Sequence, residues 1–343
     1  MRFAELDYLR GFAALAVVGF HFLYLGPSSD WMVGNKSDLG IFAARYGYLG
    51  VHLFFMISGF VIMMSAQGAT VRDFFISRFA RLAPAMWICA TLTSLTIVIS
   101  QTSLGSVSWF KWVANLTLVP HWFGVGPIDG AYWSLVVEIH FYLAVGILIY
   151  LRQLKKVEQI LYFWLVVSLV NYLRPMHPIQ LFLNANWAPL LCAGSLLFFV
   201  KKNGWNKSRL IGLGVCFVLA LLYELRSLQS SYSEIRWTAC FILGFLFFLF
   251  AYLSTANLGF KSTKLSRFLG EITYPLYLLH QTIGYVLFNS HFAKGLIEDD
   301  QLRISVIAIA LVGMAWIIHR RIEKPLARTI KKMFQNSQKP LTS

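Results

Sequence analysis

The chain has 343 residues, of which 57% are hydrophobic, 16% are aromatic and only 13% are charged. A soluble domain carries about 25% charged residues, so this composition excludes an ordinary soluble domain and predicts a protein whose surface faces lipid. The net charge of +15 could indicate nucleic-acid binding, but the placement of the Lys and Arg residues, given below, argues against it.

The apolar segments predict an all-α integral membrane protein, a bundle of about ten transmembrane helices. We expect a membrane-embedded domain over residues 1–330 and a basic cytoplasmic tail over residues 331–343. Two segments, 159–173 and 187–200, are shorter than the roughly 20 residues that a crossing needs. The predicted spans are 6–25, 48–66, 84–100, 133–151, 159–173, 187–200, 210–225, 236–254, 273–290 and 302–319.

The first span could be mistaken for a secretory signal, but no A-x-A-like cleavage site follows it, so we predict an uncleaved helix. Arg10 and His21 lie in this helix. Their spacing of 11 residues places them on one helix face, about 16 Å apart along the axis. A charged group in hydrocarbon costs at least about 2.5–3.5 kcal/mol, which makes both candidate functional residues. A snorkelling arginine and a histidine bonded to a neighbouring helix would give the same pattern.

The segment after the second span, residues 72–84, is predicted to be an inward loop that ends at Pro84. Arg78 and Arg81 in this segment would share a helix face at i, i+3. Paired guanidinium groups suit phosphate, so the two arginines could bind a phosphate group. Basic residues are expected on the inward side in any case, so topology alone also explains the pair.

The longest outward loop, about residues 101–132, contains Trp109, Lys111, Trp112 and Trp122. Such an aromatic-rich pattern is typical of a segment that lies in the membrane interface and does not cross the bilayer. The loop could also form the mouth of a substrate site.

Glu138 lies five residues inside the outward end of the fourth span, where an unpaired carboxylate would be costly. We expect it to pair with His21, which lies at a comparable depth. A carboxylate that orients an imidazole and stabilises its protonated form is the usual second element of a histidine base. A structural polar pair between helices is the alternative.

The ninth span has Pro275 near its expected first turn and His280 near mid-membrane. Proline is tolerated there as a helix start or as a kink. For His280, a hydrogen-bonded core histidine is favoured over a catalytic one by the residues alone, and more strongly so for His140 in the fourth span.

The Lys and Arg residues sort by side of the membrane. With a cytoplasmic N-terminus, 22 of the 30 fall in the tails and inward loops and the other 8 in outward loops. This asymmetry follows the positive-inside rule, predicts that both termini are cytoplasmic, and explains the net charge without nucleic acid. The four cysteines lie in apolar segments without metal-type spacing, so we predict neither a disulfide nor a metal site.

Six short segments follow one another along most of the chain. They are 6–14 (LDYLRGFAA, followed by His21), 50–60 (GVHLFFMISGF), 78–84 (RFARLAP), 133–138 (WSLVVE), 274–280 (YPLYLLH) and 323–325 (EKP). Together they resemble the acyltransferase family 3 membrane enzymes, which O-acylate bacterial polysaccharides, lipopolysaccharide, peptidoglycan, Nod factors and some macrolides.

The resemblance implies that Arg10, His21, Arg78 and Arg81 are required for acyl transfer. From the matching segments we predict that His52, Trp133 and His280 bind the substrate. Two departures stand out: Ser77 replaces an arginine that is frequent in the family, and His52 replaces an acidic residue.

We therefore expect a multi-pass O-acyltransferase of the inner (plasma) membrane that uses cytoplasmic acyl-CoA, with acetyl-CoA ahead of succinyl-CoA, and no metal. Arg10, Arg78 and Arg81 would hold the donor phosphates. His21, supported by Glu138, would either deprotonate the acceptor hydroxyl or be acylated itself. The expected acceptor is a carbohydrate or lipid-linked carbohydrate, and the oligomeric state stays open.

Two other functions fit the buried charges. A proton-coupled transporter would also place Arg, His and Glu in its helices, although such carriers usually contain paired repeats, which this sequence lacks. A non-catalytic membrane subunit would predict that alanine at His21 leaves function intact.

Overall fold

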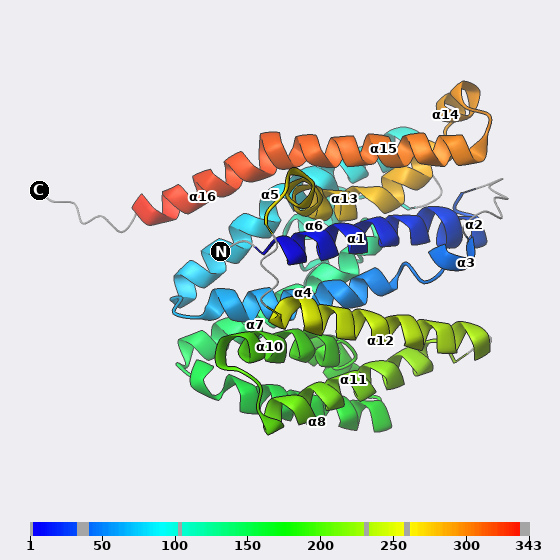
Figure 1. The fold of residues 1–343 in the computed structure, drawn as a ribbon. Coiled ribbons are helices and arrows are strands. Elements are labelled where there is room, and N and C mark those ends of the chain that lie inside the picture. The colour runs from blue at the N-terminus through cyan, green and yellow to red at the C-terminus, as the bar shows by residue number, and fades with distance from the viewer. Residues whose placement is uncertain (1–2, 33–40, 102–104, 230–232, 257–260, 337–343) are drawn as a thin grey trace, which may run out of the picture. The chain divides into compact units, whose positions relative to one another are not determined.

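The computed structural model describes residues 3–32, 41–101, 105–229, 233–256 and 261–336 (Figure 1). Within these ranges every regular element is a helix. The α-helices are α1 (Ala4–Phe20), α2 (Gly26–Ser28), α3 (Ile41–Ala44), α4 (Leu49–Ala66), α5 (Val71–Ser100), α6 (Trp109–Leu116), α7 (Trp133–Tyr150), α8 (Val157–Leu173), α9 (His177–Leu183), α10 (Ala188–Asn203), α11 (Lys207–Ser227), α12 (Ser233–Thr255), α13 (Lys264–Asn289), α14 (His291–Leu296), α15 (Asp300–Ile318) and α16 (Lys324–Asn336). Two π-helical turns, η1 (His21–Leu25) and η5 (His319–Glu323), and three 3₁₀ turns, η2 (Pro120–Phe123), η3 (Gly130–Tyr132) and η4 (Leu154–Lys156), complete the described elements.

The expectation of an all-helical membrane protein is confirmed. Among the described residues, 8 helical runs are long and apolar enough to cross a membrane. Each of the ten predicted spans overlaps a helix. Two of the ten predicted spans are not among these eight helical runs. They are α8, which has 17 residues, and α13, whose first turns carry Lys264, Arg267 and Glu271. The count of ten and the cytoplasmic placement of both termini stay predictions.

Two predicted helix boundaries were wrong, and both are at prolines. The segment predicted as an inward loop is the first part of α5, which begins at Val71 and continues through Pro84. Likewise α13 begins at Lys264, so Pro275 lies in its interior and not in its first turn. Proline removes one helical hydrogen bond, but helices of membrane proteins tolerate this because neighbouring groups satisfy the freed carbonyl.

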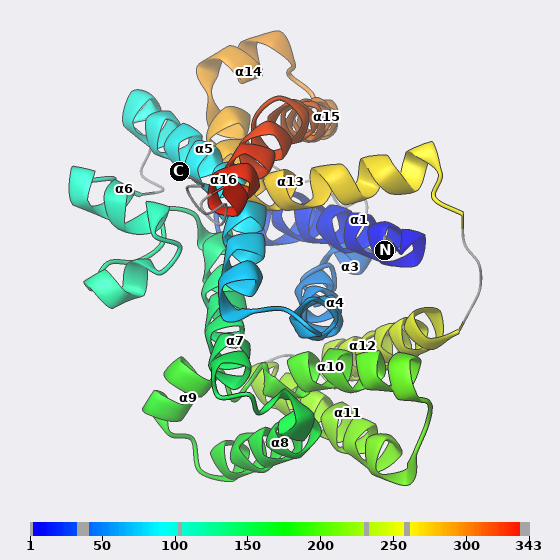
Figure 2. The same cartoon turned by 90° about the vertical axis from the view of Figure 1, so that its left-hand side faces the viewer.

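The chain divides into two compact units, of which the first comprises residues 1–13, 49–74 and 137–266. In this unit α10 packs against α4, α8, α11 and α12, and Figure 2 shows α8, α10, α11 and α12 grouped together. The contact between α4 and α10 is the closest because it is made by glycines. A Cβ at Gly59 would lie 2.1 Å from the carbonyl oxygen of Leu191, and one at Gly194 would lie 1.8 Å from that of Met56. Small residues at such contacts let helices in membranes approach closely.

The second unit comprises residues 14–48, 75–136 and 267–343. Its last helices, α15, η5 and α16, form one continuous helical run (Figure 1). The loop predicted to be outward contains α6, which is held to α5 by hydrogen bonds from the Trp87 indole to the Leu116 carbonyl and from the Trp112 indole to the Thr91 hydroxyl. Trp109 and Trp122 are exposed. The interfacial position predicted for this loop stays a prediction.

Candidate active site

His21 lies where the helix of the first span widens from α1 into the π turn η1. The turn is closed by a hydrogen bond from the Gly26 N–H to the His21 carbonyl. Single π turns within helices are rare and are frequent at functional sites. Phe22, the next residue, packs against α13 at Gly284, where a Cβ would lie 2.3 Å from the Phe22 ring. This close approach brings the His21 end of the helix onto α13.

The structure brings together two of the predicted site residues, His21 and His280 of α13. His280 Nε2 lies 3.2 Å from His21 Nδ1, and the two ring centroids are 4.7 Å apart. His280 is completely buried, whereas His21 is partly exposed. The pair is therefore open on the side of His21.

The hydrogen-bond partners determine which ring nitrogens carry protons. His280 Nδ1 lies 2.9 Å from the Tyr277 carbonyl oxygen, and His21 Nδ1 lies 2.8 Å from that of Val17. A carbonyl oxygen can only accept, so each Nδ1 must donate. In a neutral ring the other nitrogen is an acceptor. His280 Nε2 thus accepts from the His21 Nδ1–H, which it shares with Val17, and His21 Nε2 keeps the lone pair of a base.

Asp129, which the sequence analysis did not select, holds α13 beside this pair. The residue is completely buried and accepts hydrogen bonds from the backbone N–H groups of Ala131 at 2.8 Å and Thr282 at 2.9 Å. It precedes the candidate span that begins at Gly130. Burial raises the pKa of its carboxyl above the ordinary value, and the two N–H groups oppose that rise. An aspartate directly before an apolar span was the signal that could have identified it.

Tyr132 adds a second attachment four residues earlier on α13, by donating its hydroxyl hydrogen to the Leu278 carbonyl at 3.1 Å. In an α-helix the Leu278 carbonyl and the Thr282 N–H would be each other's partners. Here each has a partner in the 129–132 segment. This segment is therefore hydrogen-bonded to α13 at the turn that carries His280.

Arg81 was predicted to bind donor phosphates, and it is held by a buried carboxylate. Its Nη1 donates to Glu323 Oε1 at 2.8 Å, and its guanidinium lies 5.6 Å from the centroid of the Tyr274 ring. Glu323 Oε2 lies 2.9 Å from His319 Nδ1. The Glu-Lys-Pro segment thereby acquires a structural role, which is to orient Arg81. Arg78 donates to the Ser77 hydroxyl at 3.0 Å.

The first unit contains a different buried pair, His52 and Glu224. His52 Nε2 lies 3.0 Å from Glu224 Oε2, and the side chains are 8% and 3% exposed. The rings of His52 and Trp187 meet edge to face. Glu224, near the end of the seventh predicted span, was missed in the sequence although it is a carboxylate in an apolar segment.

Glu138 accepts a hydrogen bond from the Tyr142 hydroxyl, one turn further along α7. Glu138 and Arg10 belong to the first unit and His21 to the second. The predicted pairing of Glu138 with His21, the phosphate-binding roles of Arg10, Arg78 and Arg81, and the substrate-binding roles of His52 and Trp133 all stay predictions. In the described ranges, no three His, Cys, Asp or Glu residues are grouped as a metal site.

These observations define a multi-pass helical membrane protein with a histidine pair in its second unit. Residues 3–320 match the family described as an acyltransferase domain, and the chain belongs to this acyltransferase family. The resemblance stated from the six segments is thus confirmed. No solved structure matches the chain.

Three relatives illustrate the family. Acyltransferase MdmB of Streptomyces mycarofaciens is 24% identical over 371 residues, which cover 96% of this chain and 93% of MdmB. O-acetyltransferase OatA of Staphylococcus aureus (strain NCTC 8325 / PS 47) is 27% identical over 370 residues, which cover 96% of this chain and 58% of OatA. YrhL of Bacillus subtilis (strain 168), named as a candidate peptidoglycan O-acetyltransferase, is 26% identical over 158 residues, covering 40% of this chain and 22% of YrhL. The chain thus spans little more than half of OatA.

Proposed function

We propose that this chain is an acyl-CoA-dependent O-acyltransferase that moves an acetyl group from the cytoplasmic side to a hydroxyl of an envelope or exported saccharide. The observation that carries the proposal is the histidine pair, in which the partners of His21 direct its Nδ1–H inward and leave Nε2 as a base. A neutral imidazole with one protonated nitrogen held by a partner is the form in which histidine serves as a general base.

In the direct route, His21 Nε2 takes the proton of the acceptor hydroxyl while the oxygen bonds to the thioester carbonyl carbon. The C–S bond then breaks, and the leaving thiolate receives the proton from His21 Nε2. In the alternative route, Nε2 itself attacks the carbonyl carbon and the C–S bond breaks, which releases the thiolate. The acceptor oxygen then attacks the acyl carbon, the bond to Nε2 breaks, and the hydroxyl proton passes to the thiolate. His280 fixes the tautomer of His21 in both routes and is therefore a positioning residue, in place of the substrate-binding role predicted for it.

The donor side of the proposal rests on Arg10, Arg78 and Arg81. The Arg81 side chain is 36% exposed while the Glu323 side chain is buried, so the ion pair orients a guanidinium that solvent can reach. Guanidinium groups bind phosphate oxygens in pairs. Glu138 would support His21 as predicted. His52 and Trp133 would contact the acceptor.

The acceptor side is supported by the names of two relatives, one an O-acetyltransferase and the other a candidate peptidoglycan O-acetyltransferase. From these names we propose that this chain also acts on a carbohydrate acceptor, free or lipid-linked. The placement proposed is the plasma membrane, with ten crossings, both termini in the cytoplasm, a membrane domain over residues 1–330 and a basic tail over residues 331–343.

The test is transfer of radiolabelled acetyl from acetyl-CoA to extracted envelope glycans in membranes that contain the wild-type chain or His21→Asn. Asparagine keeps a donor for the Val17 carbonyl but has no basic nitrogen. We expect label in the glycans with the wild type and its loss with the variant at equal protein level. The matched control is His177→Gln, because His177 is exposed and outside the proposed site.

Each other outcome contradicts part of the proposal. Label that survives His21→Asn would remove His21 from the chemistry and would favour a non-catalytic subunit. Absence of label with every donor and acceptor tried, together with proton-dependent solute uptake in vesicles, would favour the transporter.

A further inference from the structure

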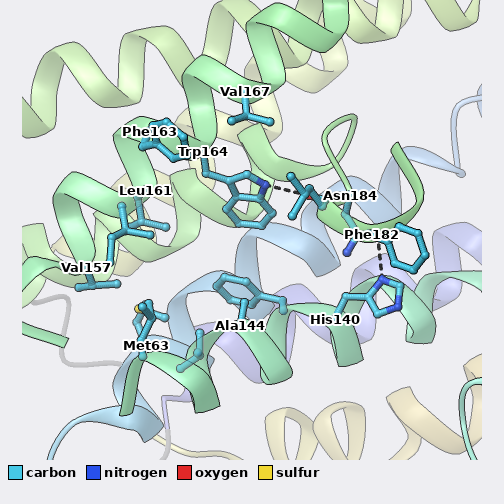
Figure 3. A pocket seen from close by; sticks show the side chains of 15 residues that line it. Met63, His140, Ala144, Val157, Leu161, Phe163, Trp164, Val167, Phe182 and Asn184 are labelled. Carbon is cyan, nitrogen blue, oxygen red and sulfur yellow. Dashed lines mark hydrogen bonds between the residues drawn. The ribbon is translucent and has the colours of Figure 1, made fainter. Parts of the chain in front are cut away.

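The first unit contains a pocket that the proposed chemistry does not use (Figure 3). The pocket has a volume of about 220 Å³ and lies against α7, α8 and the segment around α9. Along α7 it runs from His140 to Leu148, a rise of about 12 Å. An apolar cavity of about 150 Å³ suffices for benzene, so this pocket can hold a hydrocarbon chain of more than six carbons.

The pocket lining is mostly apolar and suits hydrocarbon. Two of its polar groups bond to protein: the Trp164 indole N–H donates to the Leu183 carbonyl at 2.8 Å, and the Asn184 amide donates to the Val137 carbonyl at 3.3 Å. Figure 3 shows the Trp164 and His140 rings, each with its hydrogen bond to the 182–184 region. The remaining lining is aliphatic, aromatic or thioether.

Two exposed apolar side chains line the pocket, and we expect lipid to cover them because α8 is one of the ten predicted spans. They are Phe163 and Phe182, which are 67% and 62% exposed. In a multi-pass membrane protein, exposed large apolar side chains on a spanning helix are covered by hydrocarbon. The molecules that we expect to enter the pocket are therefore lipid chains.

The turn between α7 and α8 is basic and adjoins the pocket. Arg152, Lys155 and Lys156 are exposed and directly precede Val157, which lines the pocket. Glu158 does not neutralise this turn, because both of its carboxylate oxygens accept hydrogen bonds from Arg209 at 2.8 Å. Clustered basic residues beside a membrane attract anionic lipid headgroups.

We propose that the pocket binds one acyl chain of an anionic phospholipid, whose phosphate is held at the basic turn. The lipid is a bound component of the first unit and is distinct from the acyl donor and from the acceptor. Lipid binding at this pocket requires no part of the proposed acyltransferase mechanism.

The test uses the full chain in nanodiscs of phosphatidylcholine that contain a small amount of phosphatidylglycerol with a photoreactive diazirine in its acyl chain. After irradiation, the labelled residues are located by mass spectrometry of peptides. We expect label within residues 140–167. Ala144→Phe, which fills the pocket from an exposed position on α7, should reduce that label at least about fivefold, and Ala144→Leu should have an intermediate effect.

The matched control is Ala310→Phe, the same change at an exposed position on α15, which should leave the label unchanged. The headgroup is tested by placing the same diazirine chain on phosphatidylcholine and by the double variant Lys155→Gln with Lys156→Gln. We expect weaker labelling in both cases. For the double variant, the loss of labelling should be about fivefold for each lysine removed.

Three outcomes would overturn the proposal. Label that Ala144→Phe does not reduce, with the variant folded as judged by gel filtration, would show that no chain enters the pocket. Equal labelling by both phospholipids would show that the site does not recognise the anionic headgroup. Displacement by a polyprenyl phosphate at concentrations where phosphatidylglycerol does not compete would identify an isoprenoid as the occupant.

Discussion

His52 in the first unit and His21 in the second have different partners, although both are histidines in apolar helices. His52 Nε2 faces the Glu224 carboxylate at 3.0 Å, whereas His21 Nδ1 faces His280 and a backbone carbonyl. A carboxylate partner stabilises the protonated form of the imidazole and holds the ring in place. His52 and Glu224 are both buried, whereas His21 is partly exposed, so its far nitrogen can meet a substrate.

The comparison teaches that access to the ring separates the two histidines, because both members of the His52–Glu224 pair are buried whereas His21 can be reached from outside. We infer that the His52–Glu224 pair chiefly stabilises the first unit and that the His21–His280 pair performs chemistry. The predictions that follow test this division, beginning with the largest effect.

Replacing His21 by Asn should lower acetyl transfer by about 100- to 10,000-fold, which is the usual contribution of a general base. Thermal stability should change little, because asparagine can still donate to the Val17 carbonyl. The measurement is the initial rate of transfer at equal protein level. A rate within threefold of the wild type would break the comparison, since His21 would then be no more catalytic than His52.

Replacing His52 by Ala should lower the free energy of unfolding by about 3–5 kcal/mol, because it leaves the buried Glu224 carboxylate without this partner. His52→Gln, which retains a donor, should cost less. Thermal melting of the purified protein in detergent measures both. The KM for the acceptor should be compared as well: a raised KM in a stably folded His52→Gln would support the predicted role of His52 in substrate binding and would blur the division.

Replacing Asp129 by Ala should destabilise the second unit, because the N–H groups of Ala131 and Thr282 lose their buried acceptor. Each such group costs about 1–3 kcal/mol. The transfer rate should fall together with the melting temperature, since α13 carries His280. Glu298→Ala, at an exposed acidic residue, is the control and should change neither quantity. A large loss of rate without loss of stability would instead indicate that Asp129 takes part in the chemistry.

Replacing His280 by Ala should lower the transfer rate by about tenfold, the equivalent of one hydrogen bond. The loss should lie in kcat and not in the KM for either substrate. His280→Gln offers an oxygen near the position of Nε2 and should recover part of the rate. Equal losses in both variants, or a loss confined to the acceptor KM, would return His280 to the substrate-binding role predicted from the sequence.

The sequence predicted what depends on local composition and missed what depends on neighbours. His21, His280 and Arg81 were recognisable because ionisable residues in apolar helices are costly and the surrounding segments resemble a known family. Pro84 and Pro275 misled the helix boundaries, because proline usually ends a helix in water but is accommodated within membrane helices. The contact between His21 and His280 joins residues 259 positions apart, and no local pattern encodes such a distance.

Asp129 and Glu224 were missed for related reasons. Asp129 stands in a loop by sequence, and only the docking of that loop on α13 makes it completely buried. Glu224 lies close to a predicted helix end, where an exposed carboxylate would be ordinary. In both cases the burial is created by an element far away in the chain.

Because residues 129–132 are hydrogen-bonded to α13, one amide of α13 reports on the loop that precedes α7. The Thr282 N–H is held by Asp129, so its exchange with deuterium should be slow while the loop is docked and should accelerate when the loop lifts. A ligand that loosens the loop would be detected at Thr282, two residues from His280. Deuterium uptake at this single position therefore measures how far events at the loop reach the histidine pair.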